Sequence, residues 1–132
     1  RLRVEALAAA QPALQDAVVA GHDRAFVALL AWPNLAACRA LVGADDETPA
    51  DAVLADPEVR RRVVDGIRRH NAEAGGSSRR IARVLLMAEP ASIDAGEITD
   101  KGYVNQAATL ERRGALVEKL FSDPPPPEVW VL

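Results

Sequence analysis

The pattern of apolar and polar positions predicts a chain of short helices separated by strands. Apolar residues at helical spacing, ended by prolines, glycines and capping residues, indicate the helices. They are expected at 2–10, at a short segment after Asn34, and at 49–54, 57–71 and 105–121. In the segment 57–71, Val59, Val63 and Ile67 follow each other every four residues, and this spacing predicts the buried side of the helix.

Continuous apolar runs predict the strands. Residues 14–20 and 25–32 are joined by Gly21-His22-Asp23-Arg24, a turn sequence that favours an antiparallel hairpin. Because both runs are almost entirely apolar, we expect both faces of the sheet to be covered, at least in part. A third strand is expected at 81–88, and 128–132 is either an edge strand or a loose segment. The sum is an α+β fold, a small and mostly antiparallel sheet of three or four strands with helices packed against it.

Local signals place the ends of several elements. Thr48 and Asp56 each precede a proline, so each is expected to cap a helix whose first residue is that proline. In the helix 105–121, we expect Arg112 and Arg113 to lie largely on the polar side. The segment Gly75-Gly76-Ser77-Ser78 is expected to be a flexible connection, too short for an interdomain linker.

Composition narrows the function classes. The chain has 132 residues, enough for a single domain, and its net charge of −3 argues against a general nucleic-acid binder. No apolar run is long enough to span a bilayer, so no membrane association is expected. One cysteine, Cys38, and two histidines suffice for neither a disulfide framework nor a metal site, and they favour the cytoplasm. Because the sequence begins at Arg1 and lacks an initiator methionine, we expect it to be a fragment, a processed product or an excised domain.

The most informative stretch carries one lysine on a short turn between two glycines. It reads Gly96-Glu97-Ile98-Thr99-Asp100-Lys101-Gly102-Tyr103-Val104-Asn105-Gln106. Gly96 and Gly102 allow backbone angles that other residues avoid. Lys101 is therefore either a solvated loop lysine or a cation directed at an anionic group.

This stretch resembles the catalytic-lysine motif of the acyl-adenylate-forming enzymes, commonly written Thr-Pro-Ser-Gly-Lys-Ile-Asn-Arg. Its form is most similar to the feruloyl-CoA synthetase branch, where Gly-Glu-Ile-Thr-Asp-Lys-Gly-Tyr leads into an Asn-Gln helix. The segments 16–24 and 32–34 are also similar to that branch. The resemblance implies that residues 1–132 are a single C-terminal lid domain, whose partner is its own N-terminal adenylation domain.

The implied activity is that of an acyl-CoA synthetase, which uses ATP, Mg²⁺ and coenzyme A to activate a carboxylic acid, aromatic acids included. None of these is expected to bind the chain by itself, and the chain alone is expected to be inactive. By the resemblance, Lys101 serves adenylation. An ungapped alignment on Thr99 and Gly102 instead puts Tyr103 at the position of the family's lysine. We favour a shifted lysine. Tyr103 is kept as a cofactor-binding candidate, and its plainer interpretation is a residue at the domain interface.

The resemblance implies two further contacts with coenzyme A. Gly21 corresponds to a glycine near the path of the thiol, and Arg68 or Arg69 to an arginine that contacts the 3′-phosphate. The plainer interpretations are a hairpin turn and the solvated side of a helix. The densest basic region consists of Arg60, Arg61, Arg62, Arg68, Arg69, Arg79, Arg80 and Arg83. The alternative function is a stand-alone interaction domain, which would keep the lid fold and dock a partner through these arginines.

Overall fold

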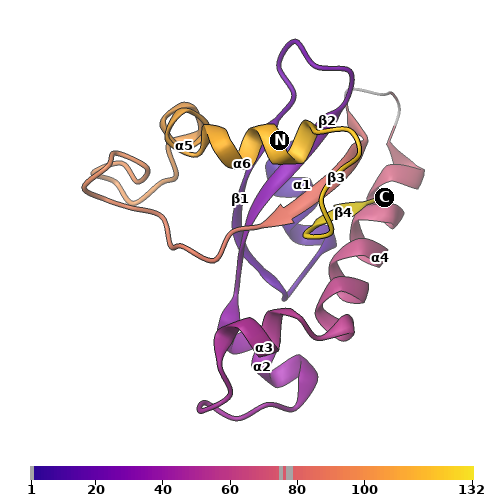
Figure 1. The fold of residues 1–132 in the computed structure, drawn as a ribbon, viewed down its shortest axis with the longest axis vertical. Coiled ribbons are helices and arrows are strands. Elements are labelled where there is room, and N and C mark those ends of the chain that lie inside the picture. Colours follow the sequence, from indigo (N-terminus) through magenta and orange to yellow (C-terminus); the bar gives the residue numbers. More distant parts are fainter. Residues whose placement is uncertain (1, 75, 77–78) are drawn as a thin grey trace.

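The computed structural model describes residues 2–74, 76 and 79–132, and it places helices on both faces of a four-stranded sheet (Figure 1). The helices are α1 (Leu2–Ala9), α2 (Leu35–Val42), α3 (Ala50–Leu54), α4 (Pro57–Glu73), α5 (Gln106–Arg112) and α6 (Gly114–Phe121). The strands are β1 (Leu14–Ala20), β2 (Val27–Pro33), β3 (Ile81–Leu86) and β4 (Val129–Val131). The predicted α+β class is confirmed. Most of the predicted connection 75–78 lies outside the described residues.

The strands follow one another across the sheet in chain order. β1 pairs with β2 and β3 pairs with β4 in antiparallel fashion, whereas β2 and β3 are parallel. The prediction of a mostly antiparallel sheet and of a hairpin from β1 to β2 is therefore confirmed. Parallel strands need a long crossover, and the chain from α2 to α4 supplies it. The segment 128–132, for which a loose end was the alternative, contributes the edge strand β4.

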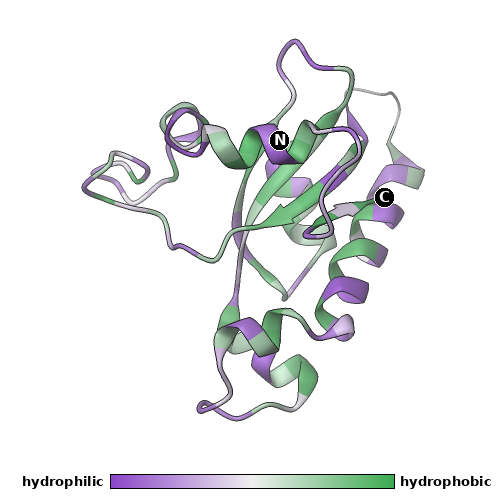
Figure 2. Ribbon diagram, viewed as in Figure 1, coloured by the Kyte–Doolittle hydropathy of each residue, from purple (hydrophilic) through white to green (hydrophobic). Residues whose placement is uncertain are grey.

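Strand β2 lies at the centre of two apolar clusters. Leu29 and Ala31 face a cluster with α1 and α4, and Leu30 and Trp32 face a second cluster with α6. This alternation is the period of two that an extended strand imposes. Figure 2 shows the strands and the inward sides of the helices as mostly hydrophobic. The expectation that both faces are covered is confirmed for β2.

Helix α4 packs with the side that the sequence predicted. Val59, Val63 and Ile67 are fully buried. At its start, the Asp56 side chain accepts a hydrogen bond from the Glu58 amide at 2.9 Å, as expected of a capping residue. The buried side and the cap of α4 could be predicted from the sequence because both depend only on residues that are neighbours on the helix.

Two local predictions are wrong. Thr48 does not cap α3, since the residue before that helix is Pro49 and no side chain caps it. The Thr48 hydroxyl donates instead to the Asp45 carboxylate at 3.0 Å. The expected helix 105–121 is divided into α5 and α6 at Arg113, whose φ of −101° and ψ of 33° leave helical geometry.

Candidate functional site

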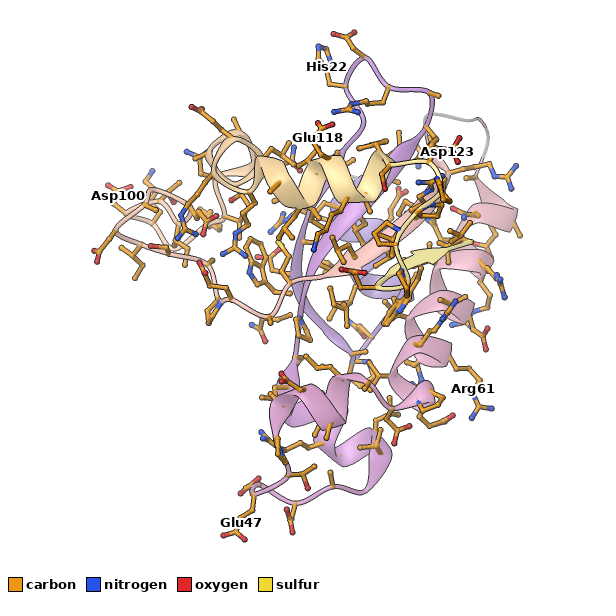
Figure 3. All side chains as sticks on the ribbon, in the orientation of Figure 1. His22, Glu47, Arg61, Asp100, Glu118 and Asp123 are labelled. Carbon is orange, nitrogen blue, oxygen red and sulfur yellow. The ribbon has the colours of Figure 1, made fainter. Side chains whose placement is uncertain are left out.

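Residues 88–105 form an arm that projects from the side of the sheet between β3 and α5 (Figure 1). Within it, Ile98 and Val104 pair as an antiparallel bridge, so the intervening residues make a hairpin. Asp100 lies at the outer end of the arm and points away from the body (Figure 3). Lys101 is the next residue, and it therefore sits where the arm is farthest from the core.

Backbone hydrogen bonds define the turn that carries Lys101. The Thr99 amide donates to the Tyr103 carbonyl at 2.7 Å, and the Gly102 amide donates to the Thr99 carbonyl at 2.9 Å. Gly102 has φ of +86°, a conformation that glycine adopts without steric cost. Lys101 is exposed, and none of the ion pairs found in the described part of the chain includes it. Its ammonium group is thus available to an external anion.

Tyr103 lies on the same hairpin. The residue is 68% exposed, and its amide donates to the Thr99 hydroxyl at 3.2 Å. An aromatic side chain this exposed suits an interface with another domain. The hairpin presents Lys101 and Tyr103 together, so both assignments of the lysine position remain compatible with the geometry.

An apolar hollow of about 410 Å³ lies between the hairpin and the body. Ile98, Gly102 and Val104 line it on the arm. Trp32 and Met87 line it on the sheet side. The arm therefore has an apolar inner side and a polar outer end.

The base of the arm contains a buried ion pair between Glu97 and Arg113. Glu97 is fully buried and Arg113 is only 7% exposed. Arg113 Nε donates to Glu97 Oε2 at 2.7 Å, and Nη2 donates to Oε1 at 3.0 Å. Oε1 also accepts from the Ser92 amide at 2.9 Å and from Arg112 Nη1 at 3.1 Å. Both carboxylate oxygens have donors, as a buried charge requires.

These contacts lower the pKa of Glu97 from its ordinary value of 4.5 to about 2. The largest cause is the hydrogen bond from Arg113, which outweighs the opposing effect of burial. The Ser92 amide and the charges of Arg113 and Arg112 lower the pKa further. Glu97 is therefore ionised at neutral pH and serves as a fixed negative charge.

The prediction that Arg113 lies on the polar side of one continuous helix is wrong. Besides pairing with Glu97, its Nη1 donates to the Glu89 carbonyl and its Nη2 to the Pro90 carbonyl, each at 2.9 Å. At this break between the two helices, the guanidinium reaches both the first residues of the arm and its buried carboxylate. One signal of the break was present in the sequence, since an isolated glycine, Gly114, interrupts the helical pattern there.

Gly21 directly follows β1, at the turn of the hairpin. Its φ is +140°, and a Cβ atom there would lie 2.7 Å from the Phe26 carbonyl oxygen. The turn itself therefore requires glycine. Gly21 also lines a shallow hollow together with Leu110 of α5 and Gly114 of α6, away from the Lys101 hairpin.

Arg68 and Arg69 are both exposed near the end of α4, but they line different hollows. Arg68 shares its hollow with Phe26 and Arg80. Arg69 lines one hollow with Glu5 and other residues of α1, and a second one with residues of its own helix, Glu58, Arg61, Arg62 and Asp65. The structure thus separates two residues that the sequence could not tell apart, and it joins neither of them with Lys101.

Other arginines of the basic region make structural contacts. Arg61 pairs with Glu58 on α4, as the interpretation of a solvated helix side predicted. Arg79 pairs with Glu5 at 2.8 Å. The guanidinium of Arg83 lies over the Phe26 ring, 4.6 Å from its centroid. These three arginines therefore have partners within the chain.

The remaining sequence candidates are placed as follows. Cys38 is buried in the core, and burial raises the pKa of its thiol. His22 lies at the end of the hairpin turn (Figure 3).

Within residues 2–74, 76 and 79–132, no group of three or more His, Cys, Asp or Glu side chains could hold a metal ion. Across the same residues, every helix is too short or too polar to cross a membrane.

One comparison with known proteins found a match. A family model described as the AMP-binding enzyme C-terminal domain matches residues 2–124. Neither the curated proteins nor the solved structures gave a match. Because the family model covers nearly the whole chain, this protein belongs to the family of AMP-binding enzyme C-terminal domains, which pair with an N-terminal domain in adenylate-forming enzymes.

Proposed function

We propose that this chain is the mobile C-terminal domain of an ATP-dependent acyl-CoA synthetase, similar to the feruloyl-CoA synthetases. Membership in the family supports the adenylation part of the proposal. The observation that carries the proposal is the exposed Lys101 at the outer end of a hydrogen-bonded hairpin. A cation so far from its own core can enter a cleft on a neighbouring domain.

In the first half-reaction, a carboxylate oxygen of the acid attacks the α-phosphorus of ATP. An oxygen–phosphorus bond forms, and the bond to pyrophosphate breaks. Negative charge gathers at the α-phosphate, where the ammonium group of Lys101 stabilises it. The N-terminal adenylation domain would bind ATP, Mg²⁺ and the acid. No magnesium ligand is assigned to this chain, because its described residues contain no suitable cluster.

In the second half-reaction, the thiol sulfur of coenzyme A attacks the acyl carbon, and AMP leaves. A movement of the domain would withdraw Lys101 and bring the Gly21 turn to the reacting centre. Between the two arginine candidates for the 3′-phosphate, we favour Arg68. Its hollow also contains Arg80, and two guanidinium groups suit a phosphate. Arg69 lines two hollows that contain other arginines as well, but each of them also has two carboxylates, and these repel a phosphate group. The carboxylates belong to Glu5 and Glu73 in one hollow and to Glu58 and Asp65 in the other.

The test replaces Lys101 by alanine in the full-length enzyme and measures the half-reactions separately. Pyrophosphate release should fall on the order of 10²- to 10³-fold, the usual effect of removing one group that stabilises transition-state charge. Acyl transfer from preformed adenylate to coenzyme A should remain. Lys119→Ala, which removes an exposed lysine from α6, is the matched control and should leave both steps unchanged.

Unchanged pyrophosphate release in Lys101→Ala would contradict the role of this lysine. Tyr103→Phe separates the two alignments, since a comparable loss in that variant would assign the position to Tyr103. The chain by itself should turn over no substrate, and detectable ATP–pyrophosphate exchange would contradict the assignment to a lid domain.

A further inference from the structure

The arm has almost no apolar core of its own. Along residues 88–108, all of which the structure describes, Glu97 is the only buried residue. Two apolar residues of the arm, Ala91 and Val104, pack against the second apolar cluster, but both are only partly buried. Directional polar contacts must therefore help to fix the position of the hairpin, and Glu97 takes part in more of them than any other residue of the arm.

Glu97 connects three points of the arm. Its amide donates to the Ser92 carbonyl at 2.9 Å, and its carboxylate accepts from the Ser92 amide at 2.9 Å. Its carbonyl accepts from the Asn105 amide at 2.8 Å, at the point where the arm enters α5. The next residue, Ile98, begins the bridge that closes the hairpin. Any displacement of Glu97 is therefore transmitted to the turn.

Arg113 fixes Glu97 to the body. Its guanidinium lies over the Trp32 ring of β2, 5.3 Å from the centroid. It also donates to the carbonyls of Glu89 and Pro90, where the arm leaves the sheet. One side chain thus joins the first residues of the arm, its buried carboxylate and the central strand. A hydrogen-bonded ion pair constrains orientation more strongly than apolar contact, because its bonds have preferred directions.

We propose that Glu97, through Arg113, is a positioning residue that sets the orientation of the Lys101 hairpin for adenylation. This inference rests on the proposed function of Lys101. Glu97 touches no substrate and exchanges no proton. Its carboxylate, held by Arg113 and Arg112, keeps the arm in one orientation. Lys101 is then already oriented for catalysis when the arm meets the N-terminal adenylation domain.

The experiment uses the full-length enzyme with Glu97→Gln, which removes the charge and keeps the shape of the side chain. Pyrophosphate release should fall 10- to 100-fold, the order expected when a reacting group is misplaced by about 1 Å. Acyl transfer from preformed adenylate should stay within about twofold. Adding Glu97→Gln to Lys101→Ala should cause no further loss, because the charge being positioned is already absent. Glu128→Gln, which breaks the exposed pair with Lys119, is the matched control.

Three results would overturn the inference: unchanged pyrophosphate release, equal losses in both half-reactions, or an additional loss in the Lys101→Ala background. If Glu97→Gln does not fold, Arg112→Gln decides, since it removes only the outer, half-exposed arginine. It should show a smaller loss confined to adenylation, and a loss in both steps or in neither overturns the inference.

The results also separate the two proposals. Intact adenylation in Lys101→Ala would contradict the proposed function itself. A loss of adenylation in Lys101→Ala with none in the Glu97 variant would contradict only the positioning role.

Discussion

Replacing Glu97 by glutamine should cost the 132-residue chain about 3 kcal/mol of unfolding free energy at pH 7. Two arguments give this size. The pKa of Glu97 falls from 4.5 to about 2 on folding, and a tenfold change in acidity is worth about 1.4 kcal/mol. Independently, removing one partner of a buried ion pair typically costs about 3–5 kcal/mol, because the other charge stays buried and unpaired. That charge here is Arg113.

The same reasoning fixes the pH dependence. Since the pKa of Glu97 is lower in the folded chain, its stabilisation is complete above about pH 4.5 and disappears as the pH falls through about 2. The difference in stability between the natural chain and Glu97→Gln should therefore be constant from neutral pH to about pH 5 and then shrink. The pKa values of Asp45 and Glu128 are also lowered, but both groups titrate in the two proteins and cancel in the difference.

Urea unfolding of both proteins at pH 7, 5, 4 and 3 measures this difference directly. Glu128→Gln serves again as the control, because an exposed pair contributes at most about 1 kcal/mol. A loss below about 1 kcal/mol at pH 7 would contradict the reasoning. So would a difference between the two proteins that stays the same from pH 7 to pH 3, since the titrating carboxylate would then not be its source.

Two further predictions concern packing and reactivity. Gly66→Ala should destabilise the chain by about 1–3 kcal/mol or more in urea unfolding, because its Cβ would lie 2.1 Å from the Ala9 carbonyl oxygen where α1 crosses α4. Gly114→Ala is its control, since a Cβ there meets nothing within 4 Å, and an equal loss in the control would show that the close approach is not the cause. Cys38 should resist an aromatic disulfide reagent in the folded chain and react in urea, because it is buried and its thiol pKa is raised. Rapid reaction in the folded state would show that this part of the core opens easily.

The sequence determined those features that depend on neighbours along the chain. The buried side of α4 follows from the spacing of Val59, Val63 and Ile67, and the β1–β2 hairpin follows from two apolar runs around a glycine turn. The exposed turn at Lys101 could also be expected, because Gly102 supplies the left-handed conformation locally. The prediction of the α+β class was correct for the same reason.

The tertiary structure decided what depends on distant partners. The parallel pairing of β2 with β3 joins segments separated by three helices, and no local pattern encodes that register. The residues next to Arg113 in the sequence predict a surface position for it. It is buried instead, because Glu97 and the carbonyls of Glu89 and Pro90, all distant in the sequence, accept hydrogen bonds from its guanidinium. A charge can be buried only where the fold brings its partners together, and this is why the anchor of the arm was not visible in the sequence.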